Sequence, residues 1–353
     1  MNTPLIIGRA IWLVLLKYGR IILMKNDLKP IADAAYKVII IQAENPDGDS
    51  IGTALAIEEI LGDMGKETTL YCPVEIPQYL RYIDGWDRIT NKFDFSADTA
   101  FIVDTSSSIL LKRVLGTDGV QNFMEHHPVV VFDHHRTDGD LPFESLNLID
   151  ETAVSTGELL FKLAVEDNRT INAQAATNLF ISINSDSLGL ITENVTAETF
   201  RTCAKLIDLG ADPAKIEVSR RELMKKSPEI LEYKGRLIER IEYHLDGRLA
   251  LIHIPWDEIE EYSYQYNPTM LVLDEMRLVV GVDVAIGIKT YPDEKLTGKL
   301  RSNIPVSETI AGYFGGGGHE YASGFRIYEK YDDLVPELIS AVDKALKEYD
   351  ENL

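Results

Sequence analysis

A short apolar run followed at once by two aspartates is the feature that most constrains the fold of this chain. Residues 38–41 read VIII, and NPDGDSIG follows shortly, so that one glycine separates Asp47 from Asp49. A run of β-branched residues is typical of a central strand that is covered on both faces. A helical spacing of apolar residues then begins, over residues 51–61. Strand, acidic turn and helix together predict an α/β fold whose ligands bind at the carboxyl edge of a sheet.

The same alternation of strands and helices continues along the chain. We predict further strands over residues 68–72, 99–103 and 129–132 and a helix over 108–115, which is typical of a doubly wound parallel sheet. Helices follow over 155–164, 172–183 and 196–210. After a polar stretch, a helix over 230–243 precedes new strands at 249–254 and 282–290. A domain boundary is therefore expected between residues 215 and 228.

Acidic residues also follow two other predicted strands. FIVDTSSS places Asp104 at the end of one strand, and VVVFDHH places Asp133, His134 and His135 at the end of another. A single aspartate after a strand is often a turn former or a helix cap. Three such strand ends meeting at one sheet edge would instead form an oxygen-rich site with histidine, which suits Mn²⁺ or a similar divalent ion.

A second pair of histidines lies in the same segment, HHPVVVFDHH. His127 and His134 are separated by roughly 23 Å if the strand is extended, so only one pair can lie at the ligand edge. Because the aspartates follow their strands, we assign His134 and His135 to the site. His126 and His127 are expected to lie in an ordinary surface loop.

Composition limits the function classes. The 353 residues and the hydrophobic content of 45% are enough for two globular domains. A formal net charge of −22 argues against nonspecific binding of long nucleic acid but permits a short nucleotide held by metals. The two cysteines, Cys72 and Cys203, form no spaced metal motif, which suits buried thiols in a reducing cytoplasm.

The amino-terminal segment, residues 1–35, is predicted to be a helical extension. Arg9, Lys17 and Arg20 interrupt its apolar residues and fall on one side of a helical wheel, which predicts a basic amphipathic helix over residues 5–24. Its longest uncharged stretch is too short to span a bilayer. Three alternatives remain open: a membrane-surface or partner helix, a helix packed on its own domain, and leader sequence upstream of a start at Met24.

Ordered motifs along the chain resemble those of a known family. NPDGDSIG, VDTS and FDHH resemble the first three motifs of the DHH phosphoesterases, which include RecJ-type exonucleases, oligoribonucleases and relatives of manganese pyrophosphatases. SINSDSLGLIT supplies Asp186 as the fourth motif. GKLRS and GYFGGGGHEYASGF resemble the DHH-associated domain. The resemblance implies a DHH domain over 36–220, a smaller α/β substrate-binding domain over 221–353 and an active site in the cleft between them.

The resemblance also implies a set of metal ligands. One ion would be held by Asp47 and Asp104, and the second by Asp49, Asp104, His134 and Asp186, so that Asp104 bridges the two. The expected metal is Mn²⁺ at two sites, with Mg²⁺ or Co²⁺ as alternatives. His135 would contact the phosphate, and Asp133 would orient one of the two histidines.

Substrate-binding residues are expected in the carboxyl-terminal domain. Gly315, Gly316, Gly317 and Gly318 would let the backbone approach a phosphate or base, although a tight turn is the structural alternative. His319 follows them directly. Arg301 and Ser302 on a neighbouring strand would add donors and positive charge toward a terminal phosphate.

One motif position departs from the family pattern. The first motif normally begins with a metal-binding histidine, but the corresponding residue here is Ala43. The first metal then lacks its nitrogen ligand. Three outcomes remain open: weaker binding of that metal, its replacement by Glu44, and a protein that binds a nucleotide without cleaving it.

The sequence therefore predicts a cytoplasmic, Mn²⁺-dependent phosphodiesterase or phosphatase. It would hydrolyse short oligonucleotides or small nucleotides (nanoRNA, pAp) to mononucleotides with a metal-activated water. The alternatives are a cyclic-di-AMP or pApA phosphodiesterase and a nucleotide-binding pseudoenzyme. The expected partner is a short oligonucleotide or nucleotide and no long nucleic acid, with contact to a membrane surface and a homodimer as options.

Overall fold

The computed structural model describes residues 28–135 and 139–352 of the chain. Contacts between residues divide the chain after Met224 into two compact units, and each unit contains one β-sheet. The basic helix predicted over residues 5–24 lies outside the described residues. Within the part of the chain that the structure describes, no helix is both long and apolar enough to cross a membrane.

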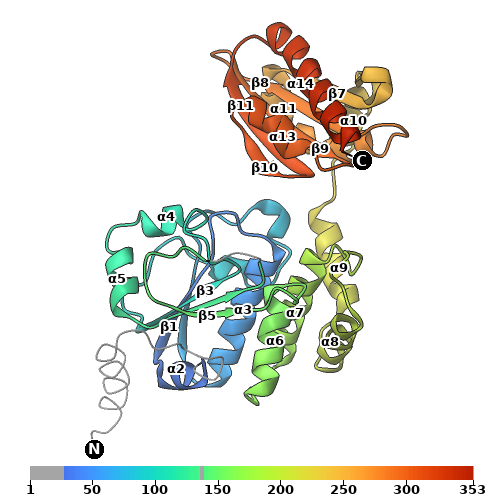
Figure 1. Ribbon diagram of the computed structural model, residues 1–353. Coiled ribbons are helices and arrows are strands. Elements are labelled where there is room, and N and C mark those ends of the chain that lie inside the picture. The colour runs from blue at the N-terminus through green and yellow to red at the C-terminus, as the bar shows by residue number, and fades with distance from the viewer. Residues whose placement is uncertain (1–27, 136–138, 353) are drawn as a thin grey trace, which may run out of the picture. The chain divides into compact units, whose positions relative to one another are not determined.

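The amino-terminal unit is built on a five-stranded parallel sheet in the order β2-β1-β3-β4-β5 (Figure 1). The strands are β1 (Lys37–Ile41), β2 (Glu67–Tyr71), β3 (Thr99–Val103), β4 (Val129–Asp133) and β5 (Leu146–Ile149). The first four confirm the strands predicted from apolar runs. The edge strand β5 was missed because it is only four residues long and alternates buried with more exposed positions.

Helices cover both faces of this sheet, as expected for a doubly wound fold (Figure 1). One face packs against α3, α6 and α7, and the other packs against residues of α4 and α5. The helices of this unit are α2 (Leu28–Ala34), α3 (Gly48–Asp63), α4 (Lys112–Leu115), α5 (Val120–His126), α6 (Thr156–Glu166), α7 (Ala173–Asp186), α8 (Ala197–Asp208) and α9 (Pro213–Leu223), with short 3₁₀ turns η2 (Gln78–Leu80) and η3 (Trp86–Arg88).

Two helix predictions in this unit were wrong. The helix expected over 108–115 is reduced to α4, because the Ser108 backbone N–H and hydroxyl both donate to the Asp140 carboxylate and hold this end of the segment outside the helix. The stretch read as polar after residue 210 instead contains α9. Asp212 caps that helix by accepting from the Lys215 N–H, and Pro213 occupies its first turn.

The carboxyl-terminal unit contains a six-stranded mixed sheet in the order β10-β11-β9-β8-β7-β6, in which only β7 and β8 run parallel. Its strands are β6 (Glu242–His244), β7 (Leu249–Ile254), β8 (Val284–Thr290), β9 (Lys295–Ser302), β10 (Gly317–His319) and β11 (Ala322–Tyr328). The helices are α10 (Pro228–Glu239), α11 (Trp256–Tyr262), α12 (Leu273–Arg277), α13 (Ser307–Tyr313) and α14 (Tyr331–Glu351), with 3₁₀ turns η4 (Leu245–Gly247) and η5 (Pro268–Leu271).

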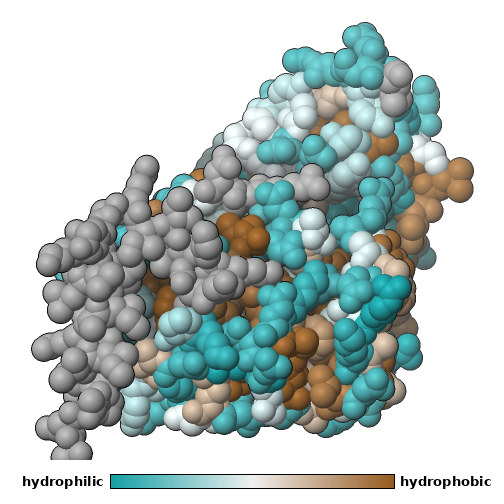
Figure 2. Space-filling view, turned by 60° about the horizontal axis from the view of Figure 1, so that its bottom comes forward, coloured by the Kyte–Doolittle hydropathy of each residue, from teal (hydrophilic) through white to brown (hydrophobic). Residues whose placement is uncertain are grey.

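The predicted helix over 230–243 ends earlier than expected, at Glu239. The chain then forms the edge strand β6, which pairs antiparallel with β7 and satisfies backbone groups that a longer helix would have used. One core of this unit joins the sheet to α13 and α14, and a second joins it to α10, α11 and α12. In the view of Figure 2, hydrophobic areas of the described surface are broken up by hydrophilic ones.

A close contact between α3 and α7 positions the ligand edge of the first sheet. A Cβ atom added to Gly52 of α3 would lie 2.5 Å from the carbonyl oxygen of Asn178 in α7. A Cβ atom added to Gly157 of α6 would lie 2.1 Å from the Ser182 hydroxyl of α7. Glycine is thus required at both positions because backbone and short side chains meet there.

We expect Gly52→Ala to lower the free energy of unfolding by about 1–3 kcal/mol, because the helices must separate to admit the methyl group. Gly62, in the same helix, has no atom within 4 Å of an added Cβ and is the matched control. Gly62→Ala should raise stability by about 0.5–1 kcal/mol through helix propensity alone. Urea unfolding followed by circular dichroism measures both, and equal stabilisation by the two changes would contradict the close contact.

Candidate functional site

The acidic strand ends lie at the point where the strand order of the first sheet reverses. Asp47 and Asp49 follow β1, Asp104 follows β3, and β1 and β3 are neighbours although β2 lies between them in the sequence. Ligands of doubly wound folds bind at this kind of switch point. Asp47 caps α3, since it accepts from the Ser50 N–H while the Ser50 hydroxyl accepts from the Asp47 N–H.

Asp49 is fully buried and held by four donors. Its Oδ1 accepts from the hydroxyls of Thr53 at 2.9 Å and Ser182 at 2.5 Å. Backbone N–H groups at the start of α6 donate to the same carboxylate, from Thr156 at 2.7 Å and Gly157 at 3.2 Å. Asp49 therefore has its charge stabilised by a helix N-terminus and its orientation fixed by three different helices.

Asp104 sits in a left-handed backbone conformation, with φ of 64°. Aspartate tolerates this conformation better than most residues do. The Asp104 N–H still donates to the Phe132 carbonyl oxygen of β4 at 2.8 Å, so the chain turns directly after the sheet contact. Its Oδ1 accepts from the Thr156 hydroxyl at 3.0 Å. The turn thus directs this carboxylate toward Asp49 and α6.

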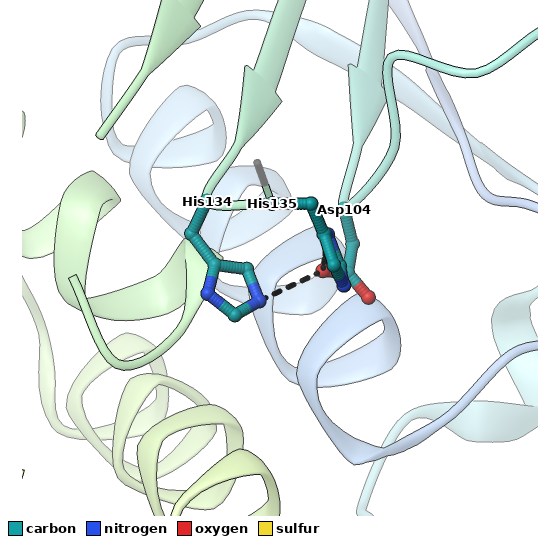
Figure 3. A group of neighbouring side chains, drawn as sticks. All are labelled: Asp104, His134 and His135. Atoms are coloured by element: carbon teal, nitrogen blue, oxygen red, sulfur yellow. Dashed lines mark ion pairs between the residues drawn. The ribbon is translucent and has the colours of Figure 1, made fainter. Parts of the chain in front are cut away.

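His134 lies among three carboxylates, of which Asp104 is drawn beside it in Figure 3. Its Nε2 is 3.1 Å from Asp186, 3.6 Å from Asp49 and 3.7 Å from Asp104. Although Asp186 is close, the buried Nε2 makes no hydrogen bond of acceptable geometry with any described residue. The other ring nitrogen, Nδ1, lies 3.3 Å from the Ala153 carbonyl oxygen. An imidazole ring that is held through Nδ1 and directs Nε2 toward carboxylate oxygens is arranged as a metal ligand.

His135 is oriented by Asp133. The buried Asp133 carboxylate lies 2.8 Å from His135 Nδ1 and also accepts from the His135 N–H at 3.1 Å. This carboxylate raises the pKa of His135, which is half exposed. Figure 3 shows the His135 ring beside Asp104, and the closest approach of these two side chains is 3.9 Å. The structure thus places Asp133 against His135 rather than against His134.

The electrostatics of the cluster favour a bound cation. Burial, followed by the charge of Asp49, raises the pKa of Asp104 well above its usual value and also raises that of Asp47. Burial raises the pKa of Asp186 to about 6 even though His134 opposes the shift. Burial alone would lower the pKa of His134, but Asp186 and Asp49 raise it to about 9. The clustered carboxylates repel one another at neutral pH.

Among the described residues, no lysine or arginine forms an ion pair with these aspartates. Two groups of side chains have donor atoms close enough to share an ion: Asp49, His134 and Asp186, and Asp104, His134 and His135. Carboxylate oxygens with imidazole nitrogen suit a divalent ion such as Mn²⁺. The residues present therefore fit a metal, which would relieve the repulsion among the buried acids.

The motif position occupied by Ala43 is buried and contributes no ligand atom from its side chain. Glu44 beside it is engaged elsewhere, because its carboxylate lies 3.4 Å from the Arg113 guanidinium and accepts from the Arg113 N–H. Gln42 is fully buried, and neither polar atom of its amide has a hydrogen-bond partner among the described residues. The structure therefore does not bring Glu44 into the metal cluster.

The predicted substrate residues divide between two sides of the second sheet. Arg301 and Ser302 are consecutive in β9, so their side chains point to opposite faces. Ser302 is fully buried and accepts from the Ser307 hydroxyl at 2.8 Å, beside the core under α13. Arg301 is partly buried and donates to the Leu300 carbonyl oxygen. The structure does not bring Ser302 to the face that Arg301 occupies.

The glycine run begins with a turn and ends in β10. Gly315 and Gly318 have positive φ values of 68° and 148°, and a Cβ on Gly316 would lie 2.2 Å from the Gly324 carbonyl oxygen. An added Cβ on Gly317 would meet no atom within 4 Å. Close packing against β11 thus explains why residue 316 is a glycine. No such contact explains Gly317, because the space beside its Cα atom is empty. His319 pairs with Ala322 in register.

Several residues that hold the ligand aspartates in place were not predicted from the sequence. Thr156 and Ser182 contact the ligand aspartates through side chains, and Gly157 does so through its N–H. They are 107 or more positions from Asp49, and only the folded chain brings them together. The one local signal is Ser155, which caps α6 and indicates that a helix begins there. His126 and His127 lie before β4, away from the ligand edge as expected, but His126 ends α5 and His127 stacks on Phe123 of that helix, so they do not form the expected loop.

Comparison with known proteins agrees with this geometry. Residues 37–183 match the model of the DHH family, N-terminal domain. A "Bifunctional oligoribonuclease and PAP phosphatase NrnA" from Thermus thermophilus is 27% identical over 282 residues, which cover 79% of this chain and 81% of the relative. The protein of the same name from Bacillus subtilis is 20% identical and covers 93% of this chain and 100% of the relative.

Solved structures share the fold. The crystal structure of an exopolyphosphatase-related protein from Bacteroides fragilis has a TM-score of 0.77 at 21% identity, covering 92% of this chain and 96% of that one. At this identity the likeness concerns the fold alone, and it extends over both units. The family match, the ordered motifs and the convergence of their side chains at one sheet edge lead to a single assignment. Residues 37–183 of this chain match the N-terminal domain of the DHH family in sequence and carry its ordered motifs.

Proposed function

We propose that this protein is a metal-dependent phosphoesterase that hydrolyses short oligonucleotides or small nucleotides, such as nanoRNA and pAp, to mononucleotides. The observation that carries the proposal is His134 Nε2, which makes no hydrogen bond within the part of the chain that the structure describes and lies within 3.7 Å of Asp49, Asp104 and Asp186. The relatives named as oligoribonucleases and PAP phosphatases, similar over most of both chains, support this substrate class.

We take the metal ligands from the motifs; of these, Asp49, Asp104, His134 and Asp186 belong to the groups whose donor atoms lie close enough to share an ion, and Asp47 belongs to neither. Asp47 and Asp104 would hold one ion, and Asp49, Asp104, His134 and Asp186 would hold the other, with Mn²⁺ as the expected metal. When bound, the ions would lower the pKa of a water molecule and neutralise negative charge on the phosphate.

The chain's own residues perform the remaining tasks. Asp133 accepts from His135 Nδ1 and raises the pKa of this half-exposed ring, so that the protonated imidazole can donate from Nε2 to a phosphate oxygen. Thr156 joins the two halves of the cluster, because its N–H donates to Asp49 and its hydroxyl donates to Asp104. The fixed orientation of both carboxylates means that little reorganisation accompanies binding.

Ala43 favours a second candidate function, a protein that binds a nucleotide without cleaving it. The side chain of Ala43 supplies no nitrogen, and Glu44 is held by Arg113. The first metal would then rely on Asp47 and Asp104 with water or substrate oxygen.

The decisive experiment measures turnover of a substrate panel with Mn²⁺. The panel contains pAp, pApA, cyclic dinucleotides, oligonucleotides of about two to five residues and a long single strand, since the net charge of −22 disfavours long polyanions. We expect hydrolysis of the short substrates, none by Asp104→Asn, and little cleavage of the long strand. Binding without any turnover would favour the second candidate, and equal cleavage of the long strand would contradict the substrate class.

Thr156→Val should weaken Mn²⁺ binding by about 10–100-fold, the usual cost of losing a residue that orients metal ligands. The change keeps the shape of this buried side chain but removes the hydroxyl that donates to Asp104. Thr177→Val is the matched control, because its hydroxyl bonds only the Ala173 carbonyl oxygen within α7. Isothermal titration with Mn²⁺ measures both, and unchanged affinity in Thr156→Val would refute this role.

Ala43→His should lower the Mn²⁺ concentration needed for half-maximal activity by about one to two orders of magnitude. Losing a residue that only orients a metal ligand weakens metal affinity by about that factor, and gaining a ligand should strengthen it at least as much. Glu44→Gln should leave it unchanged, since Glu44 binds Arg113. Activity is measured against Mn²⁺ concentration with pAp. If Glu44→Gln abolishes activity while Ala43→His has no effect, Glu44 is the substitute ligand.

A further inference from the structure

A second cavity of about 190 Å³ lies in the amino-terminal unit, and none of the aspartates of the candidate metal cluster is among its lining residues. It is lined by α7, by α9 with the turn before it, and by the loop between η2 and η3. The helices α7 and α9 are neighbours in Figure 1. Since a water molecule takes up about 30 Å³, the cavity has room for about six water molecules or for one small organic ring system.

One face of α7 forms a wall of this cavity. Its lining residues follow the helical spacing i, i+3, i+4 and i+7, and they are Gln174, Thr177, Asn178 and Ile181. A helix face that packs only against a core is usually apolar, but three of these four side chains are polar. The wall is therefore suited to contact with polar groups inside the cavity.

The Asn178 side chain has a hydrogen-bond donor that the protein does not use. Asn178 is fully buried, and its Oδ1 accepts from the Gln174 amide at 3.4 Å. Its Nδ2 has no hydrogen-bond partner among the residues that the structure describes. A buried donor without an acceptor is unfavourable. Because Asn178 lines the cavity, a molecule inside the cavity can supply the missing acceptor.

The other walls of the cavity are aromatic and aliphatic. Tyr82 and Ile216 line it, and both are partly buried side chains that pack against the same core to which Ile181 of α7 belongs. Burial raises the pKa of the Tyr82 phenol, so this ring is uncharged at neutral pH. An aromatic ring with branched aliphatic neighbours suits a flat ligand, because ring faces stack and apolar area is buried.

The charged residues of the lining disfavour a phosphate. Asp84 and Asp212 contribute two carboxylates against the single ammonium group of Lys215, and all three residues are exposed. Carboxylates repel a phosphate but accept hydrogen bonds from the hydroxyl groups of a ribose. The cavity thus fits an uncharged ligand that has a flat polar ring inside and hydroxyl groups toward solvent.

We propose that this cavity is a second ligand site, which binds an uncharged purine nucleoside. The Asn178 amide meets the edge of the base, where ring nitrogens and exocyclic groups present acceptors and donors side by side. The flat ring lies against Tyr82, and the ribose hydroxyls donate to Asp84 and Asp212. The site goes beyond the proposed function and takes a different ligand, because the metal cluster requires a phosphate and this cavity repels one.

The test measures binding of adenosine and AMP to the full-length protein by calorimetry in EDTA. Ser219→Trp fills the cavity, because Ser219 lines it from α9. Val218→Trp is the matched control, since this neighbouring side chain is 66% exposed and does not line the cavity. Asn178→Asp exchanges the amide nitrogen for an oxygen, and urea unfolding establishes whether this variant is folded. If it is not, the two tryptophan variants still decide the outcome.

Adenosine should bind at one site with a Kd of about 1 mM or tighter, and AMP should bind at least about 10-fold more weakly. Ser219→Trp should weaken adenosine binding by more than about 10-fold, folded Asn178→Asp by about 5- to 30-fold and Val218→Trp by less than about 2-fold. The proposal is overturned by the absence of saturable adenosine binding, by equal weakening in both tryptophan variants, by AMP binding as tightly as adenosine, or by unchanged affinity in folded Asn178→Asp. Turnover plays no part in these measurements, so failure of the proposed function leaves their result unaffected.

Discussion

The repulsion between buried carboxylates at the switch point of the first sheet governs the rest of this structure. Like charges so close together are unfavourable in a low-dielectric environment, and the fold must hold them there against that cost. It does so by surrounding Asp49 with donors from α3, α6 and α7. The tight packing of these helices, with Gly52 and Gly157 at their contacts, serves the same purpose.

Local sequence patterns predicted those site residues that directly follow a strand. Asp104 and His134 could be placed because each follows a buried apolar run, and parallel strands end at a common edge. The donors to Asp49 could not be predicted, since Thr156 and Ser182 meet it only after long-range folding. The short edge strand β5 escaped detection because only half of it is buried.

The two-residue period of a strand explains why Ser302 was wrongly grouped with Arg301 in the sequence-based prediction. The motif GKLRS groups Lys299, Arg301 and Ser302 by sequence, but alternation places Ser302 on the core side and Lys299 with Arg301. A motif of consecutive residues on a strand therefore contains two functions, one for each face. Lys289 of a neighbouring strand pairs with Thr297 and so lies on the same side as Lys299, a placement that follows only from the register.

The helix ends beside the acidic cluster have a consequence for the order of binding. Helix N-termini usually attract phosphate, but here Asp47 caps α3 and the first N–H groups of α6 donate to Asp49. The chain's own carboxylates thus occupy the donors that a phosphate would use. Under the proposed function, attraction of phosphate to this edge would depend on a bound metal, and by thermodynamic linkage a bound nucleotide would tighten metal binding by the same factor. The supply of nucleotide would thereby set how much of the protein carries its metal.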